Sequence, residues 1–263
     1  MGTSTRWEGP GGDRWRAAGG RLARWRPDQR NADQRLEEIA GDHLHALHET
    51  MRADSSAFSL HDAACTAGER LADVMGSLAK AAPKSTDEFL TLLTEEVGGD
   101  GGTLTDAALR RAAAAAGHEA LELHPELDDK MRTGSGGFAS DILCDLYQLF
   151  FADVVSEFLR SVIAEHVNLA VPVPIATDPE GRIAGWVAEQ VLTLVPSPCE
   201  EAAAVTGPEA VDTAKVVMGY AQDPVSALPE IARRLVPRTV GRVLGLITEE
   251  AVAETLKDGE AAA

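Results

Sequence analysis

Apolar residues recur every three or four positions along most of the chain, which is the spacing of one face of an α-helix. The pattern begins at Asn31 and returns over residues 60–82, where Pro83 ends the segment. The apolar positions of the first segment are Leu36, Ile39, Ala40, Leu44, Leu47 and Met51. No segment alternates apolar and polar residues as a half-buried strand does. The chain is therefore predicted to be all-α, a bundle of amphipathic helices.

Short polar motifs mark where further helices begin. Ser85 with Glu88 and Thr177 with Glu180 have the spacing of a capping box, and Thr103 with Asp106 starts another helix. Residues 178–181 also suit a β-turn, so a hairpin is an alternative there. The helical spacing of Ile183, Val187 and Val191 favours the helix. Prolines 198, 208 and 224 suit further helix starts, and the last helix is predicted over residues 237–256.

The most apolar segment, residues 139–168, predicts one long helix at the centre of the bundle. It carries too many charged residues to cross a membrane, which takes about 20 predominantly apolar residues. Its polar residues form two stripes, Asp141, Asp145 and Gln148 in the first half and Asp153, Glu157 and Arg160 in the second. The second stripe is rotated by more than a quarter turn from the first. We therefore expect this helix to bend or to pack against different neighbours along its length.

Glycine-rich segments suggest how the chain is divided. Residues 1–30 are rich in Gly, Arg and Trp and predict a flexible, disordered leader. Residues 31–132 and 138–258 would form two helical lobes, or one continuous domain. Residues 133–137 between them read as a hinge. A phosphate-binding loop is the alternative for Gly134–Gly137, although the segment lacks the lysine of a P-loop and follows a helix rather than a strand.

The charge of the chain is high and unevenly distributed. The net charge is −18, yet residues 1–30 contain seven arginines and three acidic residues, so a leader of +4 precedes a body of −22. A body this acidic repels phosphate backbones and anionic membrane surfaces. We expect no nucleic-acid binding, no transmembrane segment, and peripheral membrane contact only through the leader.

The three cysteines, Cys65, Cys144 and Cys199, lie far apart in the sequence and form no CxxC motif. They predict buried free thiols rather than a disulfide framework. No secretory signal segment is recognisable at the start of the chain. These observations favour a cytoplasmic location.

Two groups of residues have side chains that could act as metal ligands. His43, His45 and His48 lie on one helix, where His43 points away from the other two, so the group falls short of the three or four ligands of a zinc site. Asp141 and Asp145 lie one turn apart and could bind a divalent metal or a phosphorylated ligand. With Gln148 on the same stripe, a hydrated helix face is the better explanation of the pair, so no cofactor is predicted.

The leader holds the most unusual composition, because three of the four tryptophans of the chain lie in it. If residues 13–26 became helical, an apolar face flanked by arginines would result, which suits docking onto an acidic surface of the same chain, of a second copy or of a partner. The candidate partner-binding residues are Trp7, Trp15, Leu22, Trp25, Arg14, Arg21 and Arg26. A passive tail is the alternative.

No convergent set of catalytic residues is present, which favours a non-catalytic protein. We expect a helical adaptor or assembly module that uses the leader as a docking peptide for a protein partner or for self-association. The alternatives are an enzyme or ligand-binding bundle with Asp141 and Asp145 in its site, and membrane attachment through the leader.

Overall fold

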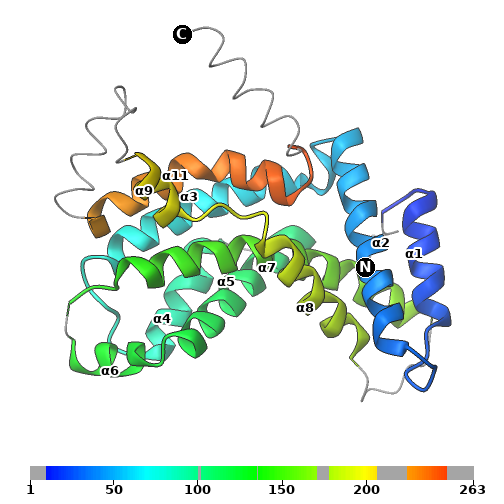
Figure 1. Cartoon of the computed structure of the whole chain (residues 1–263), viewed down its shortest axis with the longest axis horizontal. Coiled ribbons are helices and arrows are strands. Elements are labelled where there is room, and N and C mark those ends of the chain that lie inside the picture. Colours follow the sequence, from blue (N-terminus) through cyan, green and yellow to red (C-terminus); the bar gives the residue numbers. More distant parts are fainter. Residues whose placement is uncertain (1–9, 100–101, 135, 171–177, 206–223, 248–263) are drawn as a thin grey trace, which may run out of the picture.

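The computed structural model describes residues 10–99, 102–134, 136–170, 178–205 and 224–247. All regular elements in these ranges are helices, which confirms the all-α prediction (Figure 1). They are α1 (Asp13–Arg24), α2 (Ala32–Ala53), η1 (Ala57–Ser59), α3 (Leu60–Leu78), α4 (Thr86–Leu92), η2 (Leu93–Val97), α5 (Leu104–Leu123), α6 (Glu126–Thr133), α7 (Ser140–Ala170), α8 (Pro179–Leu192), α9 (Pro198–Val205) and α11 (Pro224–Val243). None of these helices is long and apolar enough to span a bilayer.

Helix α7 runs through the middle of the molecule and contacts α5, α8, α9 and α11 (Figure 1). Tyr147, Phe151 and Phe158 of α7 are fully buried. Its polar residues contact different segments. Gln148 Nε2 donates to Val195 O just after α8, whereas Glu157 pairs with Arg111 of α5. The expectation that this helix meets different neighbours along its length is confirmed.

Residues from both predicted lobes belong to one hydrophobic cluster, which extends from Trp15 to Leu244. Residues 136–138, at the end of the glycine-rich stretch between the lobes, lie beside the end of α3. Ala82 N donates to Gly136 O at 2.9 Å, and Phe138 N donates to Leu78 O at 2.8 Å. Gly137 packs so closely on α3 that a Cβ there would collide with a backbone carbonyl. Backbone hydrogen bonds therefore fix Gly136 and Phe138 beside the end of α3.

The helix starts follow the capping signals in part. At α5, Thr103 and Asp106 form the complete reciprocal capping box. At α4, Ser85 accepts from the Glu88 amide, but the Glu88 carboxylate accepts from Lys84 N, one residue outside the box. Both arrangements satisfy amides that the first helical turn leaves without an intrahelical partner.

Helix α8 exists, and the hairpin alternative at residues 178–181 is wrong. Its N-cap is Asp178, whose Oδ1 accepts from Gly181 N at 3.1 Å. Thr177, which the sequence suggested for the cap, lies outside the described residues. Asp178 takes the role because a carboxylate at this position reaches the same exposed amides.

The last described helix corrects the prediction of a helix beginning at Pro237. Helix α11 begins at Pro224 and continues through Pro229 and Pro237. A proline inside a helix removes a hydrogen bond and costs about 3 kcal/mol. The packing of α11 against α3 opposes that cost, since Gly68 and Gly76 of α3 let the helices approach closely. Helix α11 ends at Val243, so residues 244–247 do not continue the predicted helix, and residues 248–256 lie outside the described range.

The expectation of a flexible leader is wrong for the part that the structure describes, because residues 13–24 form α1 and pack on α2 (Figure 1). Trp15 is only 3% exposed, and its Nε1 donates to Thr50 Oγ1 at 2.9 Å. The Trp25 indole is also buried and donates to Ala32 O at 2.9 Å. Two anchored tryptophans outweigh the helix-weakening effect of Gly19 and Gly20, because burial of large aromatic side chains dominates such packing.

The expectation of three free thiols is also wrong. Cys144 of α7 and Cys199 of α9 form a disulfide, and Cys65 remains free and half-buried. The two paired cysteines are 55 residues apart in the sequence, but α8 turns the chain back so that α9 lies beside the start of α7. Sequence separation therefore did not indicate spatial separation.

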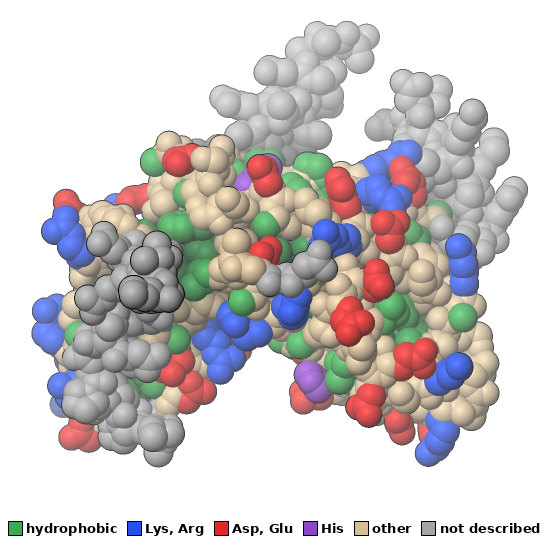
Figure 2. All heavy atoms as spheres, turned by 180° about the vertical axis from the view of Figure 1, so that it is seen from behind, with side chains coloured by type: hydrophobic (Ala, Val, Ile, Leu, Met, Phe, Trp, Pro, Cys, Tyr) green, Lys and Arg blue, Asp and Glu red, His purple; other side chains and the backbone are tan. Residues whose placement is uncertain are grey.

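The surface reflects the acidic composition. In the view of Figure 2, acidic side chains are spread over the molecule, and hydrophobic side chains are visible mainly in recesses between polar ones. Leu123 and Leu192 are the large hydrophobic side chains most exposed among the described residues. Leu192 lies at the pocket described below.

Candidate functional site

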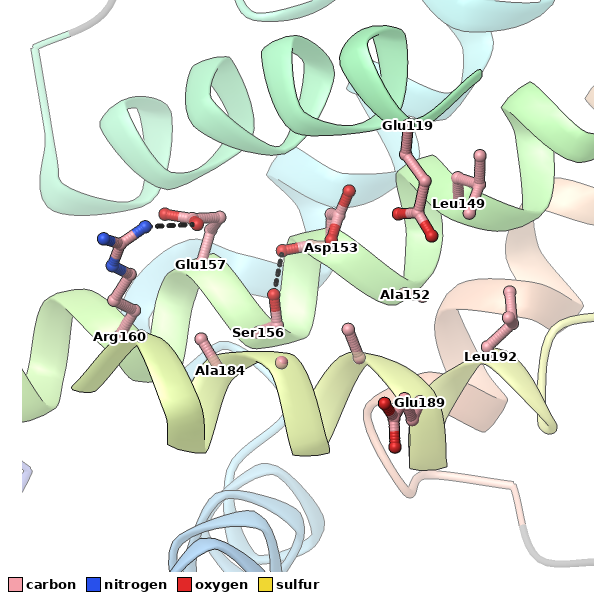
Figure 3. Close-up of a pocket in the computed structure, with 13 residues that line it drawn as sticks. Glu119, Leu149, Ala152, Asp153, Ser156, Glu157, Arg160, Ala184, Glu189 and Leu192 are labelled. Atoms are coloured by element: carbon pink, nitrogen blue, oxygen red, sulfur yellow. Dashed lines mark hydrogen bonds and ion pairs between the residues drawn. The ribbon is translucent and has the colours of Figure 1, made fainter. Parts of the chain in front are cut away.

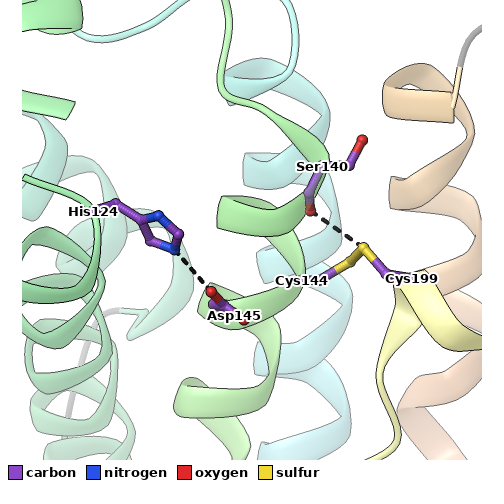
Figure 4. The surroundings of a disulfide bond; sticks show 5 residues. All are labelled: His124, Ser140, Cys144, Asp145 and Cys199. Carbon is purple, nitrogen blue, oxygen red and sulfur yellow. Dashed lines mark hydrogen bonds and ion pairs between the residues drawn. A yellow bond between two sulfur atoms is a disulfide. The ribbon is translucent and has the colours of Figure 1, made fainter. Parts of the chain in front are cut away.

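The two aspartates singled out in the sequence do not form a shared site. Asp141 is exposed at the first turn of α7. Asp145 instead pairs with His124, whose Nε2 lies 2.8 Å from Asp145 Oδ2 (Figure 4). Among the described residues, no three His, Cys, Asp or Glu side chains are arranged to hold a metal ion. Asp145 is therefore engaged by His124, and no third ligating side chain among the described residues completes a metal site with the two aspartates.

His124, which the sequence analysis did not single out, follows α5 and bridges two carboxylates. Its Nδ1 lies 3.3 Å from Glu126 Oε1, opposite the contact to Asp145. Burial lowers the pKa of His124, but the hydrogen bonds and charges of Asp145 and Glu126 outweigh it, so the pKa lies above its ordinary value. This triad stabilises the junction of α5, α6 and α7.

The three histidines of α2 have separate environments, as their helical spacing suggested. His43 is buried, with Nδ1 2.8 Å from Ile39 O, whereas His45 is exposed. His48 Nε2 lies 3.0 Å from Val243 O at the end of α11. Burial lowers the pKa of His48, and the contact to Val243 only partly opposes that effect. His48 thus connects α2 with the end of α11, and the three side chains do not converge on one point.

An acidic pocket lies between α5, α7 and α8 (Figure 3). Its volume is about 320 Å³, within the range of small-ligand sites, which begin near 300 Å³. The cavity remains open on the side of α8 because small residues of that helix, spaced about one turn apart, face it. The lining residues are Glu119 of α5, Leu149, Ala152, Asp153, Ser156, Glu157 and Arg160 of α7, and Gly181, Ala184, Gly185, Ala188, Glu189 and Leu192 of α8.

Asp153 forms part of the pocket floor and is only 7% exposed. Its Oδ2 is buried and accepts no hydrogen bond from the part of the chain that the structure describes. Burial raises the pKa of Asp153 to about 8, and the charges of Glu119 and Glu157 add to the effect. An unpartnered carboxyl oxygen at a pocket wall is unusual, because buried polar groups normally have hydrogen-bond partners.

The other acidic side chains of the pocket differ in their partners. The side chain of Glu119 points from α5 toward Asp153 on α7 (Figure 3). Burial, and to a smaller extent the charge of Glu122, raises the pKa of Glu119. Glu157 is 7% exposed and receives two guanidinium groups, from Arg111 Nε at 2.8 Å and Arg160 Nη1 at 3.2 Å. The negative charge of Glu157 is therefore compensated, whereas no arginine or lysine of the described residues pairs with Glu119 or Asp153.

One feature of the sequence indicated part of this pocket, the polar stripe in the second half of α7. Asp153, Glu157 and Arg160 interrupt its most apolar stretch at a spacing of four and three residues, which places them on one face. What the sequence could not indicate was that small residues of α8 would lie opposite this face.

The arginines and tryptophans of the predicted docking segment are engaged within the chain itself. Trp15, Leu22 and Trp25 are buried. Arg14 pairs with Glu49 at 2.5 Å and Arg21 with Asp42 at 2.6 Å, both acids lying on α2. Arg26 caps carbonyls at the end of α1, and Trp7 lies outside the described residues. Helix α1 therefore carries an apolar face flanked by arginines, and that face packs on α2.

Comparison with known proteins gives no relative: no protein-family model, no curated protein and no solved structure matches the chain.

Proposed function

We propose that this protein binds a small organic cation, a primary amine, in the acidic pocket between α5, α7 and α8. The observation that carries the proposal is Asp153, a buried carboxyl with an oxygen that lacks a partner at the wall of a cavity. An ammonium group supplies three N–H donors and a compact positive charge, which match this oxygen and the neighbouring carboxylate of Glu119.

An organic cation suits the pocket better than a metal ion. The described residues offer no cluster of three ligating side chains, as a metal site requires. Apolar and small side chains, among them Leu149, Ala152 and Leu192, line the remaining walls. Such walls favour a ligand with a hydrocarbon part beside its charge.

The experiment compares calorimetric binding of n-pentylamine to the full chain and to two variants. Asp153→Asn replaces the proposed contact, and Asp141→Asn removes the same charge from an exposed position of the same helix. We expect the wild type and Asp141→Asn to bind alike, and Asp153→Asn to lose at least about tenfold in affinity, or about 1.4 kcal/mol. Equal binding to both variants, or no binding to the wild type, would overturn the proposal.

A second substitution tests the pocket without changing a charge. A Cβ at Gly185 of α8 would contact nothing within 4 Å, so a larger side chain fits there without disturbing the helix. Gly185→Leu should fill the cavity and prevent amine binding while the melting temperature is retained. Unchanged binding by a folded Gly185→Leu protein would place the amine elsewhere.

The assembly role expected from the sequence remains a second proposal, in which α1 docks onto a second copy of the chain. Support comes from the match between the arginine-flanked apolar face of α1 and the acidic residues Asp42 and Glu49 of α2. A labelled peptide of residues 10–30 should then bind the full chain by displacing its own α1. The same peptide with both Trp15 and Trp25 replaced by Ala is the control, and absence of binding by the unaltered peptide contradicts this role.

A further inference from the structure

We propose that the ligand of the acidic pocket also carries a carboxylate, which Arg160 binds, so that the pocket selects an amino acid whose two charges are separated by a hydrocarbon chain. This inference rests on the proposed function and specifies its ligand class. It follows from how charge is distributed along the pocket.

One end of the pocket carries excess negative charge. Asp153 and Glu119 lie close enough for the charge of Glu119 to raise the pKa of Asp153, and Glu189 of α8 lines the same cavity. Among the described residues, Arg160 is the basic residue that lines the pocket, and it lies at the other end. This end matches the ammonium group of a ligand.

The other end carries excess positive charge. Glu157 is shared by Arg111 and Arg160, so that two guanidinium groups face one carboxylate. Arg111 also donates to Ser161 and keeps Glu157 compensated from the side of α5. Within the described residues, Arg160 uses only Nη1 for Glu157, and its remaining N–H groups have no protein acceptor. Arginine presents its donors as a planar fork that fits a carboxylate.

The distance between the two ends determines the shape of the ligand. Asp153 and Arg160 are seven residues apart on α7, which places their backbones roughly 10 Å apart along the helix axis. Ala184 and Gly185 of α8 also line the pocket, and their small size leaves room for a hydrocarbon chain. An α-amino acid carries both charges on one carbon and cannot reach both ends. A diamine would bring its second ammonium group to Arg160, where like charges repel.

The test measures binding of three probes of similar length to the full chain by calorimetry. They are n-pentylamine, ε-aminocaproate and cadaverine. We expect ε-aminocaproate to bind at least about tenfold more tightly than n-pentylamine, and cadaverine to bind no better than n-pentylamine. If ε-aminocaproate has no advantage over n-pentylamine, the carboxylate contact is refuted while the amine site stands. If none of the probes binds, the proposed function itself fails.

Variants of Arg160 assign the contact. Arg160→Gln should remove the advantage of ε-aminocaproate over n-pentylamine, because the guanidinium that binds the carboxylate is absent. Arg160→Lys keeps the charge without the fork and should retain part of the advantage. Arg182→Gln, on the exposed side of α8 where it pairs with Asp33, is the matched control and should change neither affinity. An undiminished advantage in folded Arg160→Gln protein overturns the assignment.

Discussion

Asp153 couples the stability of the protein to pH. Its pKa of about 8 in the folded chain lies well above the value of about 3.9 for an aspartate in an unfolded chain. The folded state therefore holds a proton that the unfolded state releases between these values. Through this group, stability falls as pH rises from about 4 to about 8, by at most about 1.4 kcal/mol per pH unit.

The corresponding prediction concerns Asp153→Asn, which keeps the size of the side chain and removes its titration. Urea unfolding between about pH 5 and pH 8 should show the variant gaining stability relative to the wild type as pH rises. Asp141→Asn, at an exposed position, should follow the wild-type curve. Parallel curves for the wild type and Asp153→Asn would show that Asp153 is ionised in the folded state at the lower pH.

The spacing of Asp141 and Asp145 predicted their shared helix face but not the partner of Asp145. Their spacing placed both on one face of a helix, as helical periodicity requires. The partner of Asp145 is His124, twenty-one residues earlier in the chain, and only the packing of α5 on α7 brings it within 2.8 Å. Periodicity along one helix contains no information about which residue of another helix lies opposite.

Two glycines inside helices, one exposed and one buried, should change the free energy of unfolding in opposite directions when each is replaced by alanine. A Cβ at Gly185 of α8 meets open space, so Gly185→Ala should stabilise the protein by about 0.5–1 kcal/mol through helix propensity. A Cβ at Gly68 of α3 would lie 2.6 Å from Phe151 and 2.9 Å from Val236. Gly68→Ala should therefore destabilise by about 1–3 kcal/mol through overpacking.

Urea unfolding at constant pH checks both substitutions. The sign of the change is the informative result, because alanine has the same intrinsic preference for either helix. A stabilising effect at Gly68 would mean that α3 and α11 can separate without loss. That result would contradict the close packing on which the proline-containing α11 depends.

The disulfide between α7 and α9 should contribute to stability chiefly by restricting the unfolded chain. Closing a loop of 55 residues is worth about 2–4 kcal/mol in typical cases. Reduction, or Cys199→Ser, should lower the unfolding free energy by that amount in urea titrations. Cys65→Ser removes the unpaired thiol and should make no comparable difference. If reduction leaves the free energy unchanged, the two cysteines are not paired in solution.

At the scale of the whole molecule, a basic N-terminal helix lies on an acidic body, and two kinds of contact hold it there. The ion pair of Arg14 with Glu49 is exposed, with side chains 63% and 46% accessible, and such pairs contribute at most about 1 kcal/mol. Trp15 is buried and hydrogen-bonded to Thr50. Truncating a buried tryptophan costs about 3–5 kcal/mol.

Trp15→Ala should therefore release α1 from α2, whereas Arg14→Gln should leave it in place. Hydrogen exchange of the amides of residues 13–24 distinguishes the two outcomes, because undocked helices lose protection. The helix should also remain protected at high salt, which screens the exposed ion pairs but not the apolar contact. Equal loss of protection in both variants would show that charge, rather than burial, holds α1.

Properties that depend on neighbours along the chain were readable directly from the amino-acid sequence. Periodic apolar positions specified helices, and short-range pairs such as Thr103 with Asp106 specified where one of them begins. The long apolar segment specified the central helix α7. These features follow from backbone geometry and hydrogen bonding within a few residues, which a single sequence displays directly.

Which distant residues meet depends instead on how the helices pack. This packing paired Cys144 with Cys199, turned Trp15 and Trp25 of the expected leader inward, and carried α11 through two prolines. It also set small residues of α8 opposite Asp153 and thereby created the pocket. The physical reason is that the free energy of burial depends on complementary surfaces from segments far apart in the chain. In these places that free energy exceeds the local cost of glycine or proline in a helix.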